Sequence, residues 1–173
     1  MIHLYTGEGK GKTSAAIGLS IRAAGWKRRI CFAQFMKGND TGELHVLEKM
    51  PEVTILRSKK NFGFYHTMSG SDKEELTAIH NEILDRLWEI AENEICDVII
   101  LDEVTYPVKW GLLSTEKLQR LLTLGKAKKE IEMVLTGRDA ENILQDAADY
   151  ITEMKCVRHP FERGVEARKG IEF

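Results

Sequence analysis

A short glycine-rich segment near the start of the chain has the residue types needed to bind the phosphates of a nucleotide. It reads Thr6-Gly7-Glu8-Gly9-Lys10-Gly11-Lys12-Thr13 and lies between a predicted strand and a predicted helix. Glycines let backbone N–H groups turn inward around phosphate oxygens, and the helix N-terminus adds the positive end of its dipole. We expect Lys12 to place its charge on the phosphates and Thr13 to place its hydroxyl on Mg²⁺. The segment therefore predicts a P-loop that binds Mg-ATP.

The spacing of these glycines departs from the usual pattern in one place. The pattern G-x-x-x-x-G-K-[ST] requires glycine at position 6, but this chain has Thr6 there and Gly7 one residue later. The alternative is a glycine-rich turn without a phosphate site. The strand–turn–helix context and an acidic pair further along the chain favour a P-loop with an unusual shape.

That acidic pair is Asp102 and Glu103, which follow the apolar run Val98–Leu101. A run that is apolar at every residue is typical of a central strand buried on both faces. Carboxylates at the carboxyl end of such a strand lie beside the P-loop, where ligands bind. We expect Asp102 and Glu103 to hold Mg²⁺ directly or through water, together with Thr13.

Two further residues are weaker candidates. Arg138, in Thr136-Gly137-Arg138, follows another predicted strand, so it should lie at the same edge of the sheet. Its guanidinium could clamp phosphates or make a structural salt bridge, and the residues do not decide between these roles. For His159, in a predicted ordered loop, we expect a structural role. Because no nucleophile–base arrangement or His/Cys ligand cluster has suitable spacing, these patterns alone indicate a Mg-ATP-binding domain with an unidentified acceptor.

Alternating strands and helices carry these residues, which indicates parallel β-α-β units. The longest predicted helix spans about 72–93, where apolar residues recur at intervals of three and four. The other predicted helices span about 12–24, 115–124 and 140–148, and the predicted strands about 2–6, 30–35, 98–101, 132–136 and 150–154, with a further apolar stretch at 53–56. We predict a single domain over residues 1–173, an α/β fold with an open, mostly parallel sheet and helices on both faces, of P-loop NTPase (RecA-like) architecture.

Composition and charge are typical of a soluble globular protein. The chain has 173 residues, of which 43% are hydrophobic and 30% charged, and its formal net charge is −2. Because that balance gives no general basic field, we expect no nucleic-acid partner, and the basic cluster Lys27-Arg28-Arg29 is interpreted as a solvated turn. No apolar run approaches the length of a membrane span, and Met1 leads directly into the first predicted strand. We therefore expect no membrane partner and a cytoplasmic location.

Five further motifs follow the P-loop in order along the chain. They are Gln34-Phe35-Met36-Lys37-Gly38, Gly42-Glu43, Leu101-Asp102-Glu103-Val104-Thr105-Tyr106, Thr136-Gly137-Arg138, and an ending with His159, Gly164, Ala167 and Gly170-Ile171-Glu172-Phe173. Together with the segment from Tyr5 to Ala16, they resemble the ATP:corrinoid adenosyltransferases of cobalamin biosynthesis and salvage. The resemblance covers nearly the whole chain, and the displaced P-loop glycine is a trait of that family.

This resemblance implies adenosyl transfer rather than phosphoryl transfer. In the family, cobalt(I) of a reduced corrinoid attacks the 5′ carbon of ATP, which lies reversed in the P-loop, and triphosphate leaves. The protein then positions the reactants and neutralises the charge of the leaving group. Arg22 matches an ATP-contacting arginine of the family, although a solvated arginine is the alternative. The triphosphate would be held by Gly7, Glu8, Gly9, Lys10, Gly11, Lys12, Thr13 and Ser14, with Arg138 as a further candidate.

The resemblance also implies an aromatic loop that presses on the corrin. The family motif G-F-x-W displaces the lower axial ligand of cobalt and so eases its reduction. Here the corresponding residues are Gly63-Phe64-Tyr65-His66, so the phenylalanine is present and the tryptophan is replaced by His66. We expect His66 to occlude the site, the alternative being coordination of cobalt, which would oppose the family mechanism. For Phe64 the alternative is ordinary loop packing, and with these alternatives the candidate catalytic residues are Lys12, Phe64 and His66.

The resemblance further implies ATP and a corrinoid as substrates, Mg²⁺ bound with ATP, a reductase that donates an electron, and a homodimer. Some longer family members carry an N-terminal extension that helps to cover the site, whereas this chain begins at the first predicted strand. Two other functions are consistent with a P-loop: a nucleoside or small-molecule kinase, and a regulatory or motor module that hydrolyses ATP. Thymidine-kinase-like chains usually add a cysteine zinc site, which this sequence lacks.

Overall fold

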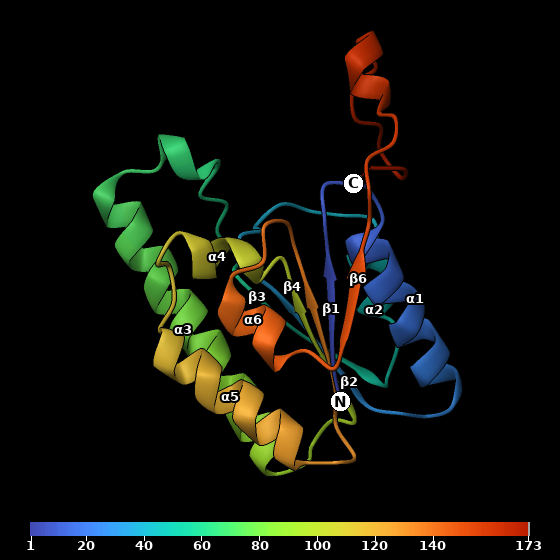
Figure 1. Cartoon of the computed structure of the whole chain (residues 1–173), viewed down its shortest axis with the longest axis vertical. Helices are drawn as coiled ribbons and strands as arrows, with labels where there is room; N and C mark the ends of the chain where they lie inside the picture. Colours follow the sequence, from blue (N-terminus) through green and yellow to red (C-terminus); the bar gives the residue numbers. More distant parts are fainter. Residues whose placement is uncertain (173) are drawn as a thin grey trace.

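The computed structural model describes residues 1–172, which fold around a six-stranded sheet (Figure 1). Phe173, the last residue of the C-terminal motif, lies outside the described residues. The strands are β1 (Ile2–Thr6), β2 (Ile30–Gln34), β3 (Val53–Arg57), β4 (Val98–Asp102), β5 (Glu132–Thr136) and β6 (Tyr150–Glu153). Their order is β3-β2-β4-β5-β1-β6, and the neighbouring strands pair in parallel. The predicted parallel α/β sheet is confirmed.

Helices cover both faces of this sheet (Figure 1). The helices are α1 (Lys12–Gly25), α2 (Leu44–Leu47), α3 (Gly70–Glu92), α4 (Thr105–Lys109), α5 (Thr115–Ala127) and α6 (Asn142–Ala147), with 3₁₀ turns η1 (Tyr65–Thr67) and η2 (Pro160–Arg163). Residues of α1 and α2 share one apolar core with the sheet, and residues of α3, α5 and α6 share the other. The sheet is therefore the middle layer of three.

Strand β4 shows why an unbroken apolar run forms the centre of such a sheet. Val98 and Ile100 belong to the core on the α1 side, whereas Ile99 and Leu101 belong to the core on the α3 side. Successive side chains of a strand point to opposite faces, so a strand covered on both faces needs apolar residues at every position. All five residues of β4 are buried, including the final Asp102.

The elements differ from their predicted bounds in ways that have local causes. Helix α3 begins at Gly70, two residues before the predicted start, because Ser69 caps it. The Ser69 hydroxyl accepts a hydrogen bond from the Asp72 amide at 3.1 Å, and an Asp72 carboxylate oxygen accepts one from the Ser69 amide at 3.2 Å. The helices α2 and α4 have four and five residues and were not predicted, because they are too short to show a helical period.

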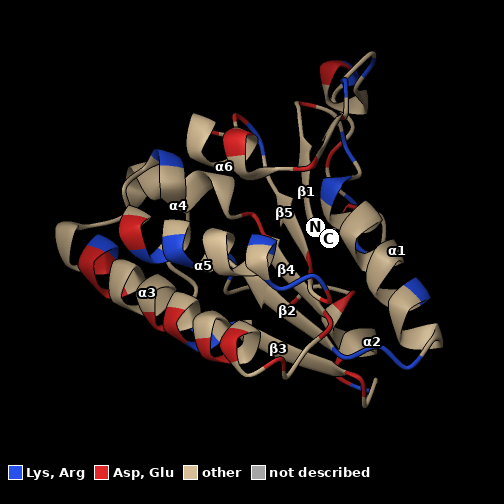
Figure 2. Ribbon diagram, turned by 60° about the horizontal axis from the view of Figure 1, so that its bottom comes forward, with Lys and Arg blue, Asp and Glu red and all other residues tan. Residues whose placement is uncertain are grey.

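Parallel strands bring their carboxyl ends to one edge of the sheet, which is the upper edge in Figure 1. The β1–α1 loop, η1 and the C-terminal segment all lie along that edge (Figure 1). Acidic and basic residues are interspersed over the rest of the ribbon, including the outer side of α3 (Figure 2). Among residues 1–172, no helix combines the length and apolar character that crossing a membrane requires.

Candidate functional site

The β1–α1 loop has the backbone conformation of a tight phosphate-binding turn. Gly7 and Gly11 have φ of 93° and 116°, a region that favours glycine. A Cβ on Gly7 or Gly9 would also meet the Met154 carbonyl oxygen at 2.6 Å. The two glycines are therefore required because the chain leaving β6 passes directly over the loop. This close approach gives a physical reason for the glycine at position 7, which the usual P-loop spacing does not contain.

Lys12 begins α1 inside this loop, and its side chain is turned back onto the loop. The Lys12 ammonium donates hydrogen bonds to the carbonyl oxygens of Gly7 at 2.6 Å and Gly9 at 2.7 Å. Burial, followed by the charge of Arg138, lowers the pKa of Lys12. Lys12 is thus a buried cation whose partners are backbone carbonyls, and phosphate oxygens are chemically suited to replace them.

Thr13 and Asp102 are in direct contact. The Thr13 hydroxyl donates to one Asp102 carboxylate oxygen at 2.8 Å, and the Thr136 hydroxyl donates to the same oxygen at 2.7 Å. The Lys37 ammonium donates to the other oxygen at 3.0 Å. Asp102 is fully buried, and these three donors, with Gln34 Nε2 at 3.5 Å, offset part of its desolvation. The contact joins the start of α1 to the end of β4, as expected for a P-loop and its acidic strand end.

Lys37 belongs to this cluster, although it was recognised only as part of the Gln34–Gly38 motif and not among the predicted site residues. Burial lowers the pKa of Lys37, but the carboxylates of Asp102 and Glu103 outweigh burial and raise it. The preceding residue, Met36, has φ of 60° and donates its amide to the His80 Nε2 atom at 3.2 Å. His80 therefore fixes the turn that carries Lys37 to Asp102.

Glu103 lies beside Asp102 but lines a cavity next to the β1–α1 loop. It has φ of 62°, and its amide donates to the Thr136 hydroxyl at 3.0 Å. Its side chain keeps 22% of its surface exposed and lies 3.9 Å from the Lys37 ammonium. Burial raises the pKa of Glu103, and the charge of Lys37 opposes that rise. Of the two acids, Glu103 is the one with a carboxylate open to a ligand.

A cavity of about 380 Å³ brings most of the predicted site residues together. Its wall contains Gly9, Lys10, Gly11, Lys12, Thr13, Ser14, Glu103, Tyr106, Arg138, His159, Ile171 and Glu172. Arg138 also lies 3.5 Å from the Glu8 carboxylate, and both side chains are well exposed. Such an exposed pair is weak, so this ion pair leaves the guanidinium available to an anion in the cavity.

Arg22 is not brought to this cavity. It lies ten residues beyond Lys12 on α1, which the helical rise converts to about 15 Å. It lines a separate hollow with Met1 and Trp26, at the edge where the strands begin. Within one chain, Arg22 is therefore too far from the β1–α1 loop to contact ATP bound there.

Phe64 and His66 lie on an exposed loop at the carboxyl edge. Phe64 is 83% exposed, and His66 is also exposed. The residue between them, Tyr65, stacks on Trp110 with ring centroids 4.4 Å apart, and Trp110 stacks on Tyr106 at 5.1 Å. Since Tyr106 lines the cavity beside the β1–α1 loop, stacked rings connect that cavity to the loop of Phe64 and His66.

His66 lies beside the stacked rings of Tyr65, Trp110 and Tyr106, which we call the aromatic ladder. Its ring lies edge-on to Trp110 with centroids 6.3 Å apart, and edge-on to Tyr65 at 5.6 Å. Trp110 and Tyr65 were not among the predicted site residues. They are far apart in the chain, and no local pattern in the sequence indicates that their rings meet.

The oxygen donors of the site suit a small hard cation. The Thr13 hydroxyl and the Glu103 carboxylate are of the kind that Mg²⁺ prefers, and Asp102 orients Thr13 from behind. In the described part of the chain there is no group of three or more His, Cys, Asp or Glu residues that could hold a metal ion. The donor set thus fits Mg²⁺ that shares its ligands with nucleotide phosphates, rather than a metal held by the protein alone.

Comparisons with known proteins identify the family of this chain. The sequence matches the family described as "ATP:corrinoid adenosyltransferase BtuR/CobO/CobP" over residues 1–173. It is 31% identical to the corrinoid adenosyltransferase of Escherichia coli K12 over 100% of this chain and 85% of that protein. It is 33% identical to the corrinoid adenosyltransferase of Pseudomonas aeruginosa over 98% of this chain and 82% of that protein.

A solved structure supports the fold. A KaiC-like protein from Pyrococcus horikoshii superimposes with a TM-score of 0.54 at 13% identity, covering 89% of this chain and 70% of that chain. At that identity the likeness concerns architecture alone, and it agrees with the predicted P-loop NTPase (RecA-like) fold. The match over the whole sequence is what sets the family: the chain belongs to the ATP:corrinoid adenosyltransferases.

Proposed function

We propose that this enzyme transfers the 5′-deoxyadenosyl group of Mg-ATP to cobalt(I) of a corrinoid at the carboxyl edge of its sheet and releases inorganic triphosphate. Membership of the family makes the chain an ATP-dependent corrinoid adenosyltransferase of cobalamin biosynthesis. The observation that supports our location of the reaction is the junction of α1 with β4, where Thr13 donates to Asp102 at 2.8 Å beside Lys12 and Glu103.

For this reaction the protein must position the two substrates and supply positive charge to the leaving triphosphate. The cobalt electron pair forms a bond to C5′, the C5′–O bond breaks, and its electron pair leaves with the triphosphate. No proton is transferred in this step, so the enzyme needs no general base. The cavity carries the charges that a leaving triphosphate needs, since Lys10, Lys12 and Arg138 all line it.

We propose that the backbone of the loop from Gly7 to Ser14 holds the triphosphate, with Lys12 turning from loop carbonyls to phosphate oxygens. Bound Mg²⁺ would supply further charge neutralisation on the phosphates. Thr13 and Glu103 would hold it, and Asp102 would keep the Thr13 hydroxyl in place. Arg138 would contact the triphosphate from the β5 side of the cavity.

We propose that Phe64 and His66 meet the corrin, because both are exposed on a loop whose neighbour Tyr65 stacks toward the nucleotide cavity. In this arrangement His66 occludes the lower face, and the ring ladder through Trp110 holds the loop in register with the nucleotide. A reductase would supply the electron that produces cobalt(I).

We also propose a single domain over residues 1–173, working in the cytoplasm as a homodimer without a nucleic-acid or membrane partner. The single domain is supported by one sheet on which the helices pack from both sides. The homodimer is supported by exposed apolar side chains on the edge strand β6, namely Tyr150 at 52% and Ile151 at 51% exposure.

Product analysis tests the function. The purified protein is incubated with Mg-ATP and chemically reduced cob(I)alamin, the cobalt–carbon bond is followed by absorbance, and the phosphate products are separated. We expect adenosylated corrinoid and inorganic triphosphate in equal amounts. ADP with a phosphorylated nucleoside would indicate a kinase, and ADP with phosphate alone would indicate a hydrolytic module; either result would contradict the proposal.

A further inference from the structure

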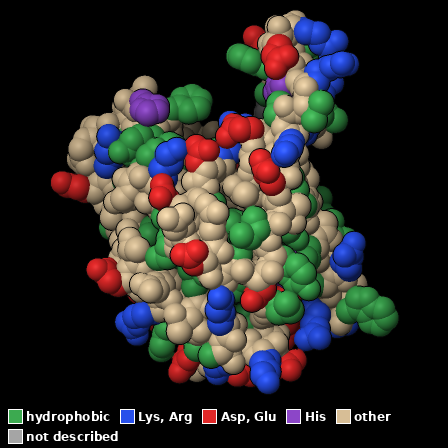
Figure 3. Space-filling model, viewed as in Figure 1, with side chains coloured by type: hydrophobic (Ala, Val, Ile, Leu, Met, Phe, Trp, Pro, Cys, Tyr) green, Lys and Arg blue, Asp and Glu red, His purple; other side chains and the backbone are tan. Residues whose placement is uncertain are grey.

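The C-terminal arm, defined here as residues 155–172, is attached to the P-loop at both of its ends. Immediately before its first residue, the Gly9 amide donates to the Met154 carbonyl oxygen at 2.6 Å. At its end, the Lys10 ammonium donates to a Glu172 carboxylate oxygen at 3.2 Å. Within the arm His159 is partly buried, and the other residues are exposed. Figure 3 shows the arm standing clear of the body of the molecule, so these end contacts determine where it lies.

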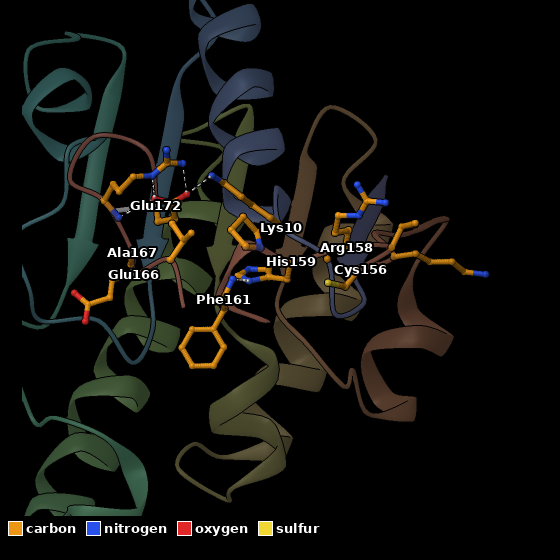
Figure 4. A pocket seen from close by; sticks show the side chains of 14 residues that line it. Lys10, Cys156, Arg158, His159, Phe161, Glu166, Ala167 and Glu172 are labelled. Carbon is orange, nitrogen blue, oxygen red and sulfur yellow. Dashed lines mark hydrogen bonds and ion pairs between the residues drawn. The ribbon is translucent and has the colours of Figure 1, made fainter. Parts of the chain in front are cut away.

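The Glu172 carboxylate is held ready for Lys10 by a second cation. Arg168 donates to Glu172 from its amide at 2.8 Å, from Nε at 3.3 Å and from Nη2 at 3.1 Å. Hydrogen bonds from Arg168, followed by the one from Lys10, lower the pKa of Glu172 to about 2, so this carboxylate is anionic at neutral pH. Figure 4 shows Lys10 and Glu172 reaching toward each other, joined by a dashed line.

The ammonium groups of Lys10 and Lys12 therefore both form hydrogen bonds within the chain. Lys12 is bonded to loop carbonyls, and Lys10 is bonded to Glu172. Glu172, Ile171 and His159 line the same cavity as Lys12 and Thr13, so the arm closes one side of the nucleotide site. A triphosphate in this cavity would place several negative charges next to the Glu172 carboxylate. Like charges repel, so the carboxylate and the triphosphate compete for Lys10.

We propose that Glu172 is an internal competitor of the triphosphate for Lys10. When the loop is empty, the carboxylate neutralises Lys10 and the end of the arm is held beside the P-loop. A bound triphosphate displaces Glu172 and releases the end of the arm. As inorganic triphosphate leaves, Glu172 returns to Lys10 and weakens rebinding of the product. The inference rests on the proposed function, because that function places a triphosphate in this loop and makes triphosphate the product.

Titration calorimetry with inorganic triphosphate and Mg²⁺ tests the competition without any corrinoid. We compare the wild-type chain with Glu172→Gln and with the control Glu162→Gln, which changes an exposed acid elsewhere on the arm. Glu172→Gln should bind triphosphate about 1.5- to 5-fold more tightly, and Glu162→Gln should match the wild type. Equal or weaker binding by Glu172→Gln would overturn the competition. Absence of binding by every variant would instead overturn the proposed function, and the competition with it.

Limited digestion with trypsin tests the movement of the arm, which offers exposed cleavage sites at Lys155, Arg158 and Arg163. In the wild type, saturating inorganic triphosphate with Mg²⁺ should increase the rate of cleavage within the arm. In Glu172→Gln the arm should be cleaved at the faster rate with or without triphosphate. If triphosphate slows cleavage or leaves it unchanged in the wild type, Glu172 does not yield to the anion and the proposal is wrong.

Discussion

Asp102 accepts hydrogen bonds from two hydroxyls and also pairs with the charge of Lys37, and replacing it with asparagine separates these two roles. The substituted side chain would keep an oxygen for the hydroxyls of Thr13 and Thr136 but would lose the charge that faces Lys37. Breaking a buried ion pair by removing one partner costs about 3–5 kcal/mol. Because Lys37 keeps 28% of its side chain exposed, we expect the lower end of that range, about 3 kcal/mol.

Urea unfolding followed by circular dichroism measures this cost, with a fall in melting temperature of roughly 6–12 °C as a second readout. The double variant Asp102→Asn/Lys37→Met should recover part of the loss, because it leaves no unpaired buried charge. The control Asp139→Asn removes an acid from the exposed pair with Lys109 and should leave the midpoint unchanged. If Asp102→Asn unfolds at the same urea concentration as the control, the buried pair does not stabilise the site as we describe.

Three further perturbations follow from the geometry. Lys12→Ala should reduce productive ATP use by about 10- to 100-fold, since charged hydrogen bonds worth about 1.5–3 kcal/mol are lost; unchanged steady-state kinetics would remove Lys12 from the site. Phe64→Ala and Trp110→Ala should each reduce activity on cobalt(II) corrinoid with a reductant more than on pre-reduced cobalt(I), and equal losses on the two substrates would assign these rings to packing alone. Burial lowers the pKa of His80 to about 4, so the unfolded chain takes up a proton first as the pH falls. The free energy of unfolding should thus decline by about 3 kcal/mol between about pH 6.5 and pH 4, and His80→Gln should lack this part of the decline.

The residues of the P-loop and the acidic strand end could be located from the sequence because local pattern and topology agree there. The unbroken apolar run before Asp102 indicated a central strand, and the glycines before Lys12 indicated a turn into a helix. Parallel strands then place both at one edge, so the contact between Thr13 and Asp102 follows from the fold class.

The contact between Lys37 and Asp102 could not be predicted in this way, because it depends on the order of the strands. It follows β2, and only the pairing of β2 with β4 brings it to Asp102. A rule that examines the residues after every predicted strand would have included it. Arg22 is the opposite case, because the family resemblance suggested a contact with ATP and within one chain the residue lines a different hollow.

The contacts in the aromatic ladder and at the C-terminal arm were still harder to predict, because they join residues far apart in the chain. Tyr65 and Trp110 meet across two separate loops, and Lys10 and Glu172 are 162 positions apart. Their residue types permit stacking and pairing with many partners, so periodicity and motif spacing contain no information about which partner is chosen. Packing in three dimensions selects it.

Titration calorimetry with Mg-ATP tests most directly whether a nucleotide triphosphate binds to the β1–α1 loop. We predict one binding site per chain in the wild type, with affinity reduced at least about 10-fold in Lys12→Ala, in line with the loss of charged hydrogen bonds. No heat of binding in the wild type, or equal affinity in the two proteins, would contradict the account.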